Sequence, residues 1–207
     1  MSTTKGRSGS TRRGFLVALG ATTVGGVLGG LLRPAQAARV MLRPPGALPD
    51  LGEFLGRCIG GRRCAQVCPN GCIDFLGVEA GLSQWGSPYI DPRNKNCILC
   101  MACTQACPTG ALTPIGADTS EVASLVRMGT AEVDEHICLS FNGFTCGTCV
   151  RACPLEGVAL RAGMYERPVV DPSRCVGCGA CERACIQTPQ AIRVRPAHGA
   201  PSLAGRS

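Results

Sequence analysis

Aromatic side chains are scarce in this sequence. They make up 4% of its 207 residues, with a single tryptophan among them. A chain with so few large apolar side chains gains little from burial to offset the conformational entropy lost on folding. Sixteen cysteines are present, so covalent or metal cross-links are the expected additional source of stability.

Signatures of catalysis are also missing. Only two histidines occur, His136 and His198, and no C-x-x-C-H motif that would attach a c-type haem is present. The sequence contains no phosphate-binding loop, Gly-rich dinucleotide fingerprint or recognisable nucleophile–base arrangement. We therefore expect no catalytic residue and interpret the chain as an electron carrier, or a non-catalytic electron-transfer subunit, rather than an enzyme.

The cysteines occur in short runs. One run reads Cys97-Ile-Leu-Cys100-Met-Ala-Cys103-Thr-Gln-Ala-Cys107-Pro, which is the C-x2-C-x2-C-x3-C-P spacing of bacterial ferredoxins. An even cysteine count also fits disulfides in an exported chain, and cysteine pairs fit zinc. Zinc ribbons need two separated pairs, so the spacing favours iron–sulfur clusters, with disulfides and zinc as the alternatives.

Three further runs have related spacing. The fourth is complete and ends at Cys185, without a proline directly after it. In the third, seven residues separate Cys138 from Cys146, and we expect this insertion to loop out while Phe141 and Phe144 shield the cluster from water. The predicted metal ligands of all four runs are Cys58, Cys64, Cys68, Cys97, Cys100, Cys103, Cys107, Cys138, Cys146, Cys149, Cys153, Cys175, Cys178, Cys181 and Cys185.

The first run lacks one ligand, because Gly61 stands where its second cysteine is expected. In two-cluster ferredoxins the fourth cysteine of each run binds the cluster of the other run. The first cluster is then left with Cys58, Cys64 and Cys107. Three thiolates suit a three-iron cluster, or a four-iron cluster with a foreign ligand, and Cys72 is the candidate for an extra ligand or a free thiol. The sequence thus predicts three or four [4Fe–4S] clusters, with a [3Fe–4S] cluster as the alternative at the first site.

The runs belong to a repeated unit of short strands and turns. The predicted fold class is α+β, with tandem bacterial dicluster-ferredoxin-like units in which short two-stranded sheets and short helices surround the clusters. Pairing the first run with the second, and the third with the fourth, needs the shorter loops, and nested pairing remains open. The predicted segments are an arm or linker at 38–52, a first unit at 53–116, a connecting helix at 117–131, a second unit at 132–196 and a disordered tail at 197–207.

The connecting helix has its own signals. Asp118 is the expected N-cap, with Glu121 three residues later, and Gly129 is the expected end. We expect its apolar face to comprise Val122, Leu125 and Val126.

Residues 1–37 are typical of a twin-arginine export signal. Arg12 and Arg13 precede an apolar stretch, and Ala35-Gln36-Ala37 fits a cleavage site. The twin-arginine translocase carries folded proteins, so clusters can be inserted before export to an oxidising compartment. We therefore predict a periplasmic protein, with an uncleaved membrane anchor as the alternative.

The positive charge is concentrated in that signal. The formal net charge is +7, and removing the five basic residues of the first 37, which include no acid, lowers it to +2. Thiolate-bound clusters add negative charge. We predict no binding to nucleic acid.

The whole pattern resembles the NapG/MauM family of periplasmic ferredoxin-type proteins. The resemblance rests on the export signal, the Arg43–Ala47 arm, the stretched third run Cys138–Pro154, and Cys175–Glu182 with the later Ala191-Ile192. It extends to about Arg195. The family normally has the second cysteine of the first run, and usually has a longer second run.

The resemblance implies an electron relay. The partners would be a membrane-bound quinol dehydrogenase or ferredoxin that oxidises quinol, and a periplasmic redox enzyme or cytochrome. Two other interpretations are carried forward: the electron-transfer beta subunit of a molybdopterin oxidoreductase, and a redox or iron sensor that uses the incomplete first site.

Overall fold

The computed structural model describes residues 39–197 and 202–203. The predicted export signal, with Arg12 and Arg13, lies outside them, and so does most of the predicted tail. The described residues belong to one compact unit. In the part of the chain that is described, no helix is both long enough and apolar enough to cross a membrane.

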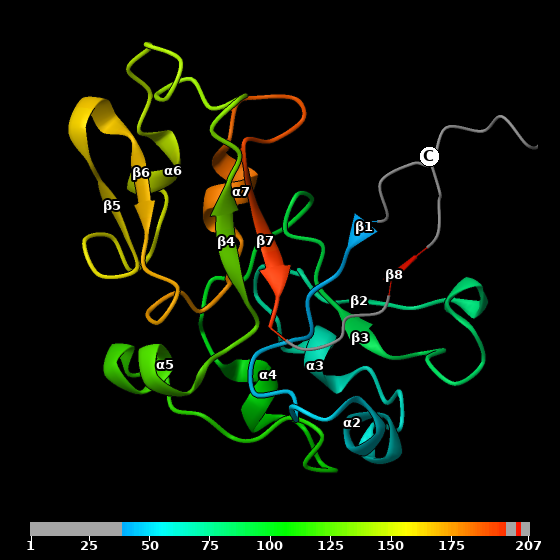
Figure 1. The fold of residues 1–207 in the computed structure, drawn as a ribbon. Helices are drawn as coiled ribbons and strands as arrows, with labels where there is room; N and C mark the ends of the chain where they lie inside the picture. The colour runs from blue at the N-terminus through cyan, green and yellow to red at the C-terminus, as the bar shows by residue number, and fades with distance from the viewer. Residues whose placement is uncertain (1–38, 198–201, 204–207) are drawn as a thin grey trace, which may run out of the picture. The chain divides into compact units, whose positions relative to one another are not determined.

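The helices and strands of the described residues are all short (Figure 1). The α-helices are α2 (Leu51–Arg57), α3 (Arg63–Gln66), α4 (Ala102–Gln105), α5 (Thr119–Leu125), α6 (Thr148–Arg151) and α7 (Ala180–Ala184). Two 3-10 helices are η1 (Val78–Ala80) and η2 (Met164–Glu166). The strands are β1 (Arg39–Val40), β2 (Asp74–Phe75), β3 (Pro88–Tyr89), β4 (Gly129–Val133), β5 (Leu160–Ala162), β6 (Pro168–Val170), β7 (Ile192–Pro196) and β8 (Ser202–Leu203).

The strands form two-stranded antiparallel sheets, in the pairs β1–β8, β2–β3, β4–β7 and β5–β6. Helix α3 packs against α4, and α6 packs against α7. The first two cysteine runs therefore share one half of the unit and the last two share the other. These elements confirm the predicted α+β class of tandem dicluster units.

The arm before α2 is packed into the structure. Leu42 exchanges two backbone hydrogen bonds with Ile90, of 2.9 and 2.8 Å, and its side chain is fully buried. The Arg43 guanidinium donates to the carbonyl oxygens of Leu48 and Pro49, at 2.7 and 2.9 Å. Arg43 therefore supplies hydrogen-bond donors to two backbone carbonyl oxygens of the arm, which burial would otherwise leave without partners.

Helix α5 forms where the sequence predicts a helix, with Asp118 as its N-cap. The Asp118 carboxylate accepts from the Ser120 N–H at 3.0 Å. Glu121 reaches back beyond the cap and accepts from the Gly116 N–H, also at 3.0 Å. Asp118 and Glu121 thus both accept hydrogen bonds from backbone N–H groups at the helix start. Asp118 binds an N–H of the first turn, whereas Glu121 binds one that precedes the helix.

The predicted apolar face of α5 is only partly right. Val122 and Val126 are buried, whereas 56% of the Leu125 side chain area is exposed. The helix also ends at Leu125 and not at Gly129, because Gly129 begins β4. Pairing of β4 with β7 fixes this boundary, and such a long-range contact is invisible to local helix signals.

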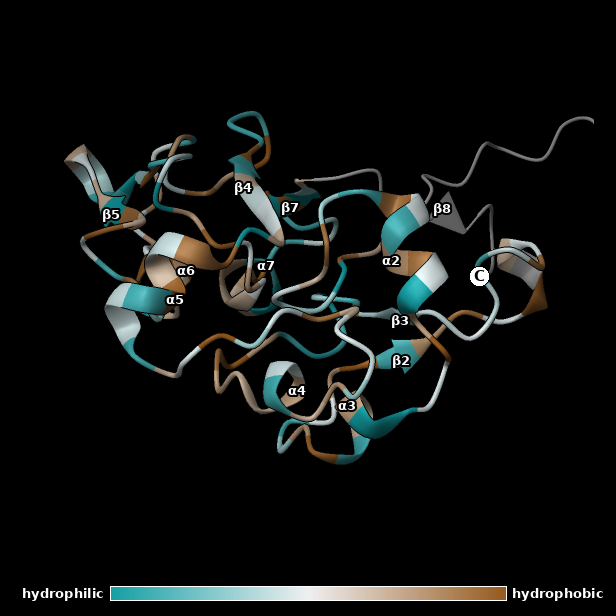
Figure 2. Cartoon of the chain, turned by 90° about the horizontal axis from the view of Figure 1, so that it is seen from below, coloured by the Kyte–Doolittle hydropathy of each residue, from teal (hydrophilic) through white to brown (hydrophobic). Residues whose placement is uncertain are grey.

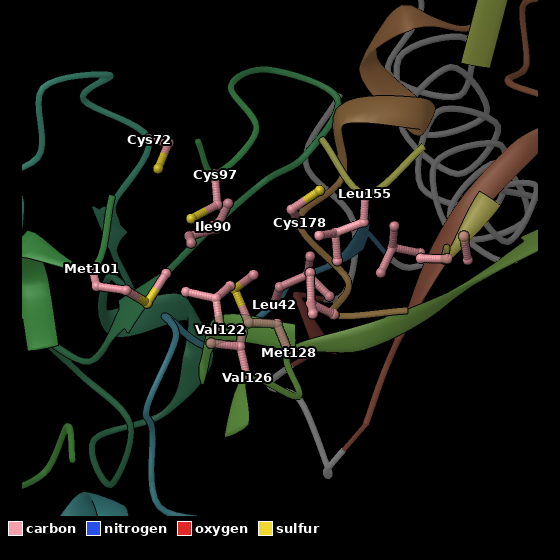
Figure 3. Close-up of a cluster of buried hydrophobic side chains, with 14 of the residues drawn as sticks. Leu42, Cys72, Ile90, Cys97, Met101, Val122, Val126, Met128, Leu155 and Cys178 are labelled. Carbon is pink, nitrogen blue, oxygen red and sulfur yellow. The ribbon is translucent and has the colours of Figure 1, made fainter. Parts of the chain in front are cut away.

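Cysteines form part of the apolar core. Helices α2 and α5 each carry hydrophilic and hydrophobic residues (Figure 2), and their buried members join a cluster that runs through the unit. Figure 3 shows Cys72, Cys97 and Cys178 among the side chains of this cluster. The labelled members also include Leu42, Ile90, Met101, Val122, Val126, Met128 and Leu155. The core is thus built around thiols, as the scarcity of aromatics suggested.

Candidate metal centres

Each cysteine run bends at one equivalent residue. This residue stands two positions before the third cysteine, and its φ is +58° at Arg62, +55° at Met101, +60° at Gly147 and +81° at Gly179. A short helix follows each bend and carries the third cysteine. Left-handed residues beside helical ones turn successive backbone N–H groups toward one point, which is how backbone concavities bind anionic groups, including iron–sulfur clusters.

A second left-handed residue lies two positions earlier in three of the runs. These residues are Gly60, Leu99 and Gly177, with φ of +64°, +60° and +73°. In the third run, among the equivalent positions only Gly147 has a positive φ. The insertion after Cys138 therefore changes the local backbone of that run, while the incomplete first run keeps the conformation of a complete one.

Site 1 is defined here by Cys58, Cys64 and Cys107. These three thiols line one apolar cavity, together with Gly61 and the loop around it. Cys64 interacts electrostatically with the other two. The fourth cysteine of the second run is thus brought to the first run.

Site 2 is defined by Cys68, Cys97, Cys100 and Cys103. Cys103 interacts with Cys100 and Cys68, and Cys72 links Cys68 with Cys97 by thiol contacts to both. The crossing of Cys68 to the second run mirrors the crossing of Cys107 to the first. This is the exchange typical of dicluster ferredoxins.

The last two runs repeat the exchange. Site 3 (Cys138, Cys146, Cys149 and Cys185) and site 4 (Cys153, Cys175, Cys178 and Cys181) each surround one cavity. The structure therefore adopts the pairing of the first run with the second and of the third with the fourth.

Backbone N–H groups point at the sulfur atoms. Ala131 N donates to Cys175 Sγ at 3.4 Å and Ala191 N donates to Cys185 Sγ at 3.3 Å. At Cys107, burial alone would raise the pKa, yet backbone donors including Leu112 and Thr109 hold the pKa below its ordinary value. Such donors stabilise a thiolate, and in iron–sulfur proteins they tune the reduction potential.

The other deep thiols need a cation to become thiolates. Burial, followed by repulsion from neighbouring cysteines, raises the pKa of Cys103 to about 12 and that of Cys178 to about 11. The same two causes raise the pKa of Cys149 to about 11. Bound iron supplies the missing positive charge, so loading such a site must release protons.

All sixteen cysteines lie within the described residues, and all are free thiols. Among those residues no group of three or more His, Cys, Asp or Glu side chains is arranged to hold a single metal ion. The sulfur-only donor sets fit a cluster, whose cysteine ligands bind different iron atoms.

Comparison with known proteins agrees with this geometry. The family model described as a 4Fe-4S dicluster domain matches residues 57–111, 96–157 and 144–188. The chain is 40% identical to the methylamine utilization ferredoxin-type protein MauM of Methylophilus methylotrophus, over 86% of this chain and 81% of that protein. It is 37% identical to the ferredoxin-type protein NapG of Escherichia coli, over 89% and 85% of the two chains. MauM of Paracoccus denitrificans is 36% identical, over 92% and 90%.

The chain belongs to the NapG/MauM family of ferredoxin-type proteins. It is an iron–sulfur protein of the electron-carrier kind, with dicluster domains that bind several [4Fe–4S] clusters. The similarity confirms the family predicted from the cysteine runs and the arm.

Cys72, which the sequence offered as an extra ligand or a free thiol, lies beside site 2 in the structure. Its Sγ lies 3.6 Å from Cys68 Sγ, and a hydrogen bond with Cys97 is the main cause that raises its pKa far above the ordinary value. Cys72 is therefore the fifth thiol of site 2. It does not line the cavity around Gly61, and its role as an extra ligand or a free thiol stays a prediction.

The expectation that Phe141 and Phe144 shield the cluster of the third run is wrong. The Phe144 side chain is 65% exposed, and the Phe141 ring stacks under the guanidinium of Arg167, 5.1 Å from its centroid. Neither ring lines the cavity of site 3, whose apolar cover includes Leu139 and Ile186. The contact between Arg167 and the Phe141 ring joins two separate segments, so only the tertiary structure could reveal it.

Two links between the halves were missed by sequence reasoning. The Cys97 N–H donates to the Cys178 carbonyl oxygen at 2.9 Å. The buried Glu182 carboxylate accepts from the Val194 N–H at 2.7 Å and from Arg93 Nε at 2.9 Å. The only sign of these links in the sequence was Glu182, a charged residue within the fourth cysteine run. Its presence there does not identify its distant partner.

Proposed function

We propose that this chain is a periplasmic electron relay. In this proposal it takes electrons from a membrane partner that oxidises quinol and passes them to a periplasmic redox enzyme or cytochrome. The fifteen cysteines of sites 1 to 4 are its cluster ligands, and each bound cluster supplies one-electron storage. The observation that carries the proposal is the unbroken order of the four sites.

Each step in that order rests on a named pair of residues. Cys64 of site 1 interacts with Cys103 of site 2, and Cys97 of site 2 is hydrogen bonded to Cys178 of site 4. The series ends where Cys181 of site 4 interacts with Cys149 of site 3. The sites therefore follow one another as 1, 2, 4 and 3.

The inner sites have more buried cysteines than the outer ones. Site 2 contains the buried Cys97 and Cys103 and site 4 the buried Cys178 and Cys181, whereas site 3 contains one buried cysteine, Cys138, and site 1 contains none. At site 1, by contrast, the cavity-lining Ile59 is 73% exposed, and at site 3 the cavity-lining Ile186 is 66% exposed. Sites 1 and 3 are thus the natural positions for entry and exit of electrons.

The relay can be tested with the full-length, anaerobically purified protein. On addition of quinol, membranes that contain the quinol-oxidising partner should bleach the visible cluster absorbance, and a periplasmic cytochrome fraction should restore it. A Cys178→Ser variant should stop transfer between the halves, whereas Cys72→Ser should leave it in place. Reduction that occurs only when a catalytic molybdopterin chain copurifies would favour the beta-subunit interpretation instead.

Location is tested separately through Arg12 and Arg13. A variant with both residues changed to lysine should accumulate in the cytoplasm, while the parent chain is recovered from the periplasmic fraction, because the translocase recognises the arginine pair. Periplasmic recovery of the double variant would contradict export by this route.

A further inference from the structure

Gly61 occupies the second-ligand position of a run that is otherwise preserved. Gly60 and Arg62 flank it with φ of +64° and +58°, as Leu99 and Met101 flank Cys100 with φ of +60° and +55°. The loop therefore has the same bend as the complete second run. What differs at site 1 is the missing thiol.

The backbone does not require glycine at this position. Gly61 is not among the glycines with positive φ. A Cβ added there would meet only the Ile59 side chain, with its nearest atoms at 3.6 Å, an ordinary van der Waals contact. A side chain is therefore tolerated, and the glycine leaves one corner of site 1 uncovered.

Nothing in the described surroundings replaces the thiol. The cavity of site 1 is lined by no aspartate, glutamate or histidine among the described residues. Cys72 is held at site 2 by Cys68 and Cys97. The Thr109 hydroxyl is directed to Cys107 Sγ, 3.7 Å away. The uncovered corner thus has no protein ligand in reach among the residues that the structure describes.

The charge around this corner is positive. Arg62 and Arg63 both line the cavity and are both exposed, and the Arg62 guanidinium is held over the Phe75 ring, 5.1 Å from its centroid. Two guanidinium groups at the mouth favour an anion from solvent over a neutral molecule. Among small anions, thiolates are the soft donors that iron–sulfur sites prefer.

We propose that site 1 has an exchangeable coordination position, at the corner left open by Gly61, that takes a small exogenous thiolate. The proposal rests on the function above only in that Cys58, Cys64 and Cys107 hold a cluster. Binding would be a ligand exchange in which the incoming thiol loses its proton to solvent and its sulfur replaces a solvent water, which leaves to bulk solvent, and no electron is transferred. An open position at one end of the relay would let a small molecule set the potential at which electrons enter or leave.

The test uses anaerobic holoprotein, 2-mercaptoethanol as the probe, and electron paramagnetic resonance of the reduced clusters. Added thiol should change the signal of one cluster in a saturable manner. Gly61→Cys should abolish this response because its own thiol fills the corner. Gly56→Cys is the matched control, since Gly56 is exposed with nothing within 4 Å of an added Cβ, and it should respond like the parent chain.

A separate variant tests the role of Arg62 and Arg63. Replacing Arg62 and Arg63 together by glutamine should raise the thiol concentration needed for half saturation by several fold, while the iron content stays at about sixteen atoms, four per cluster. An unchanged half-saturation point would overturn the role assigned to the arginines.

Two outcomes separate this proposal from the relay itself. A three-iron signal that persists after addition of ferrous iron and thiol, with sites 2 to 4 fully loaded, overturns the open-position proposal and leaves the relay intact. Little iron at any site overturns both.

Discussion

The backbone N–H of Cys97 lies 2.9 Å from the carbonyl oxygen of Cys178. This hydrogen bond joins a residue of the second cysteine run to one of the fourth, and it brings the two inner sites side by side. Both residues are buried, so the contact is shielded from water. The close packing around it leads to the first prediction.

Gly177→Ala should destabilise the protein much more than Gly157→Ala. Both glycines have positive φ, +73° and +78°, where an L side chain costs about 1–2 kcal/mol. At Gly177 the added Cβ would also lie 2.3 Å from Gly129 N, whereas at Gly157 it would meet nothing within 4 Å. Anaerobic thermal melts followed by cluster absorbance should show the larger fall in midpoint for Gly177→Ala. Equal falls would mean that Gly177 does not pack as closely against the start of β4 as described.

Glu182→Ala should cost about 2–3 kcal/mol, because it leaves a buried N–H and an arginine without their charged partner. The Glu182 side chain is 5% exposed and its Arg93 partner 42%. The matched control is Glu132→Ala, whose pair with Arg195 is exposed on both sides and should contribute about 0–1 kcal/mol. Chemical denaturation of the anaerobic holoprotein gives both values, and similar losses would contradict a structural role for Glu182.

Arg43→Ala should loosen the arm. It removes the two hydrogen bonds to Leu48 and Pro49 and the cation–π contact with Phe54, at 5.6 Å. We expect a loss of about 2 kcal/mol from hydrogen bonds that involve a charged donor. Cleavage near the arm under limited proteolysis should accelerate. Arg57→Ala, which removes only an exposed pair with Glu53, should change neither stability nor cleavage appreciably.

Cys72→Ser should leave site 1 unchanged. Its thiol lies 3.6 Å from Cys68 Sγ, so any spectroscopic change should appear in the cluster of site 2. Cys64→Ser is the comparison, because it removes one of only three thiols at site 1. Iron analysis and electron paramagnetic resonance distinguish the two variants. Loss of the site 1 signal in Cys72→Ser would return Cys72 to the role suggested by the sequence.

Several features could be predicted because they are local. Ligand spacing within a run depends on a few consecutive backbone angles, so the runs, their turns and the α+β class were recognisable in the sequence. Asp118 as a helix cap is likewise a matter of its immediate neighbours. The family followed from the same short-range patterns, and the similarity to MauM and NapG confirms it.

Tertiary structure decided everything that depends on which distant segments meet. The sequence by itself determined which thiols are available and that Gly61 is not one of them. Only the fold decided that the Cys72 thiol lies beside site 2, that Arg167 makes a cation–π contact with Phe141, and that the Cys97 N–H donates to the Cys178 carbonyl oxygen. The physical reason is that short elements with little apolar surface specify no unique partner by themselves. Their arrangement is set by the combined packing of the arm, α5, β4 and β7 around a core that consists partly of cysteines.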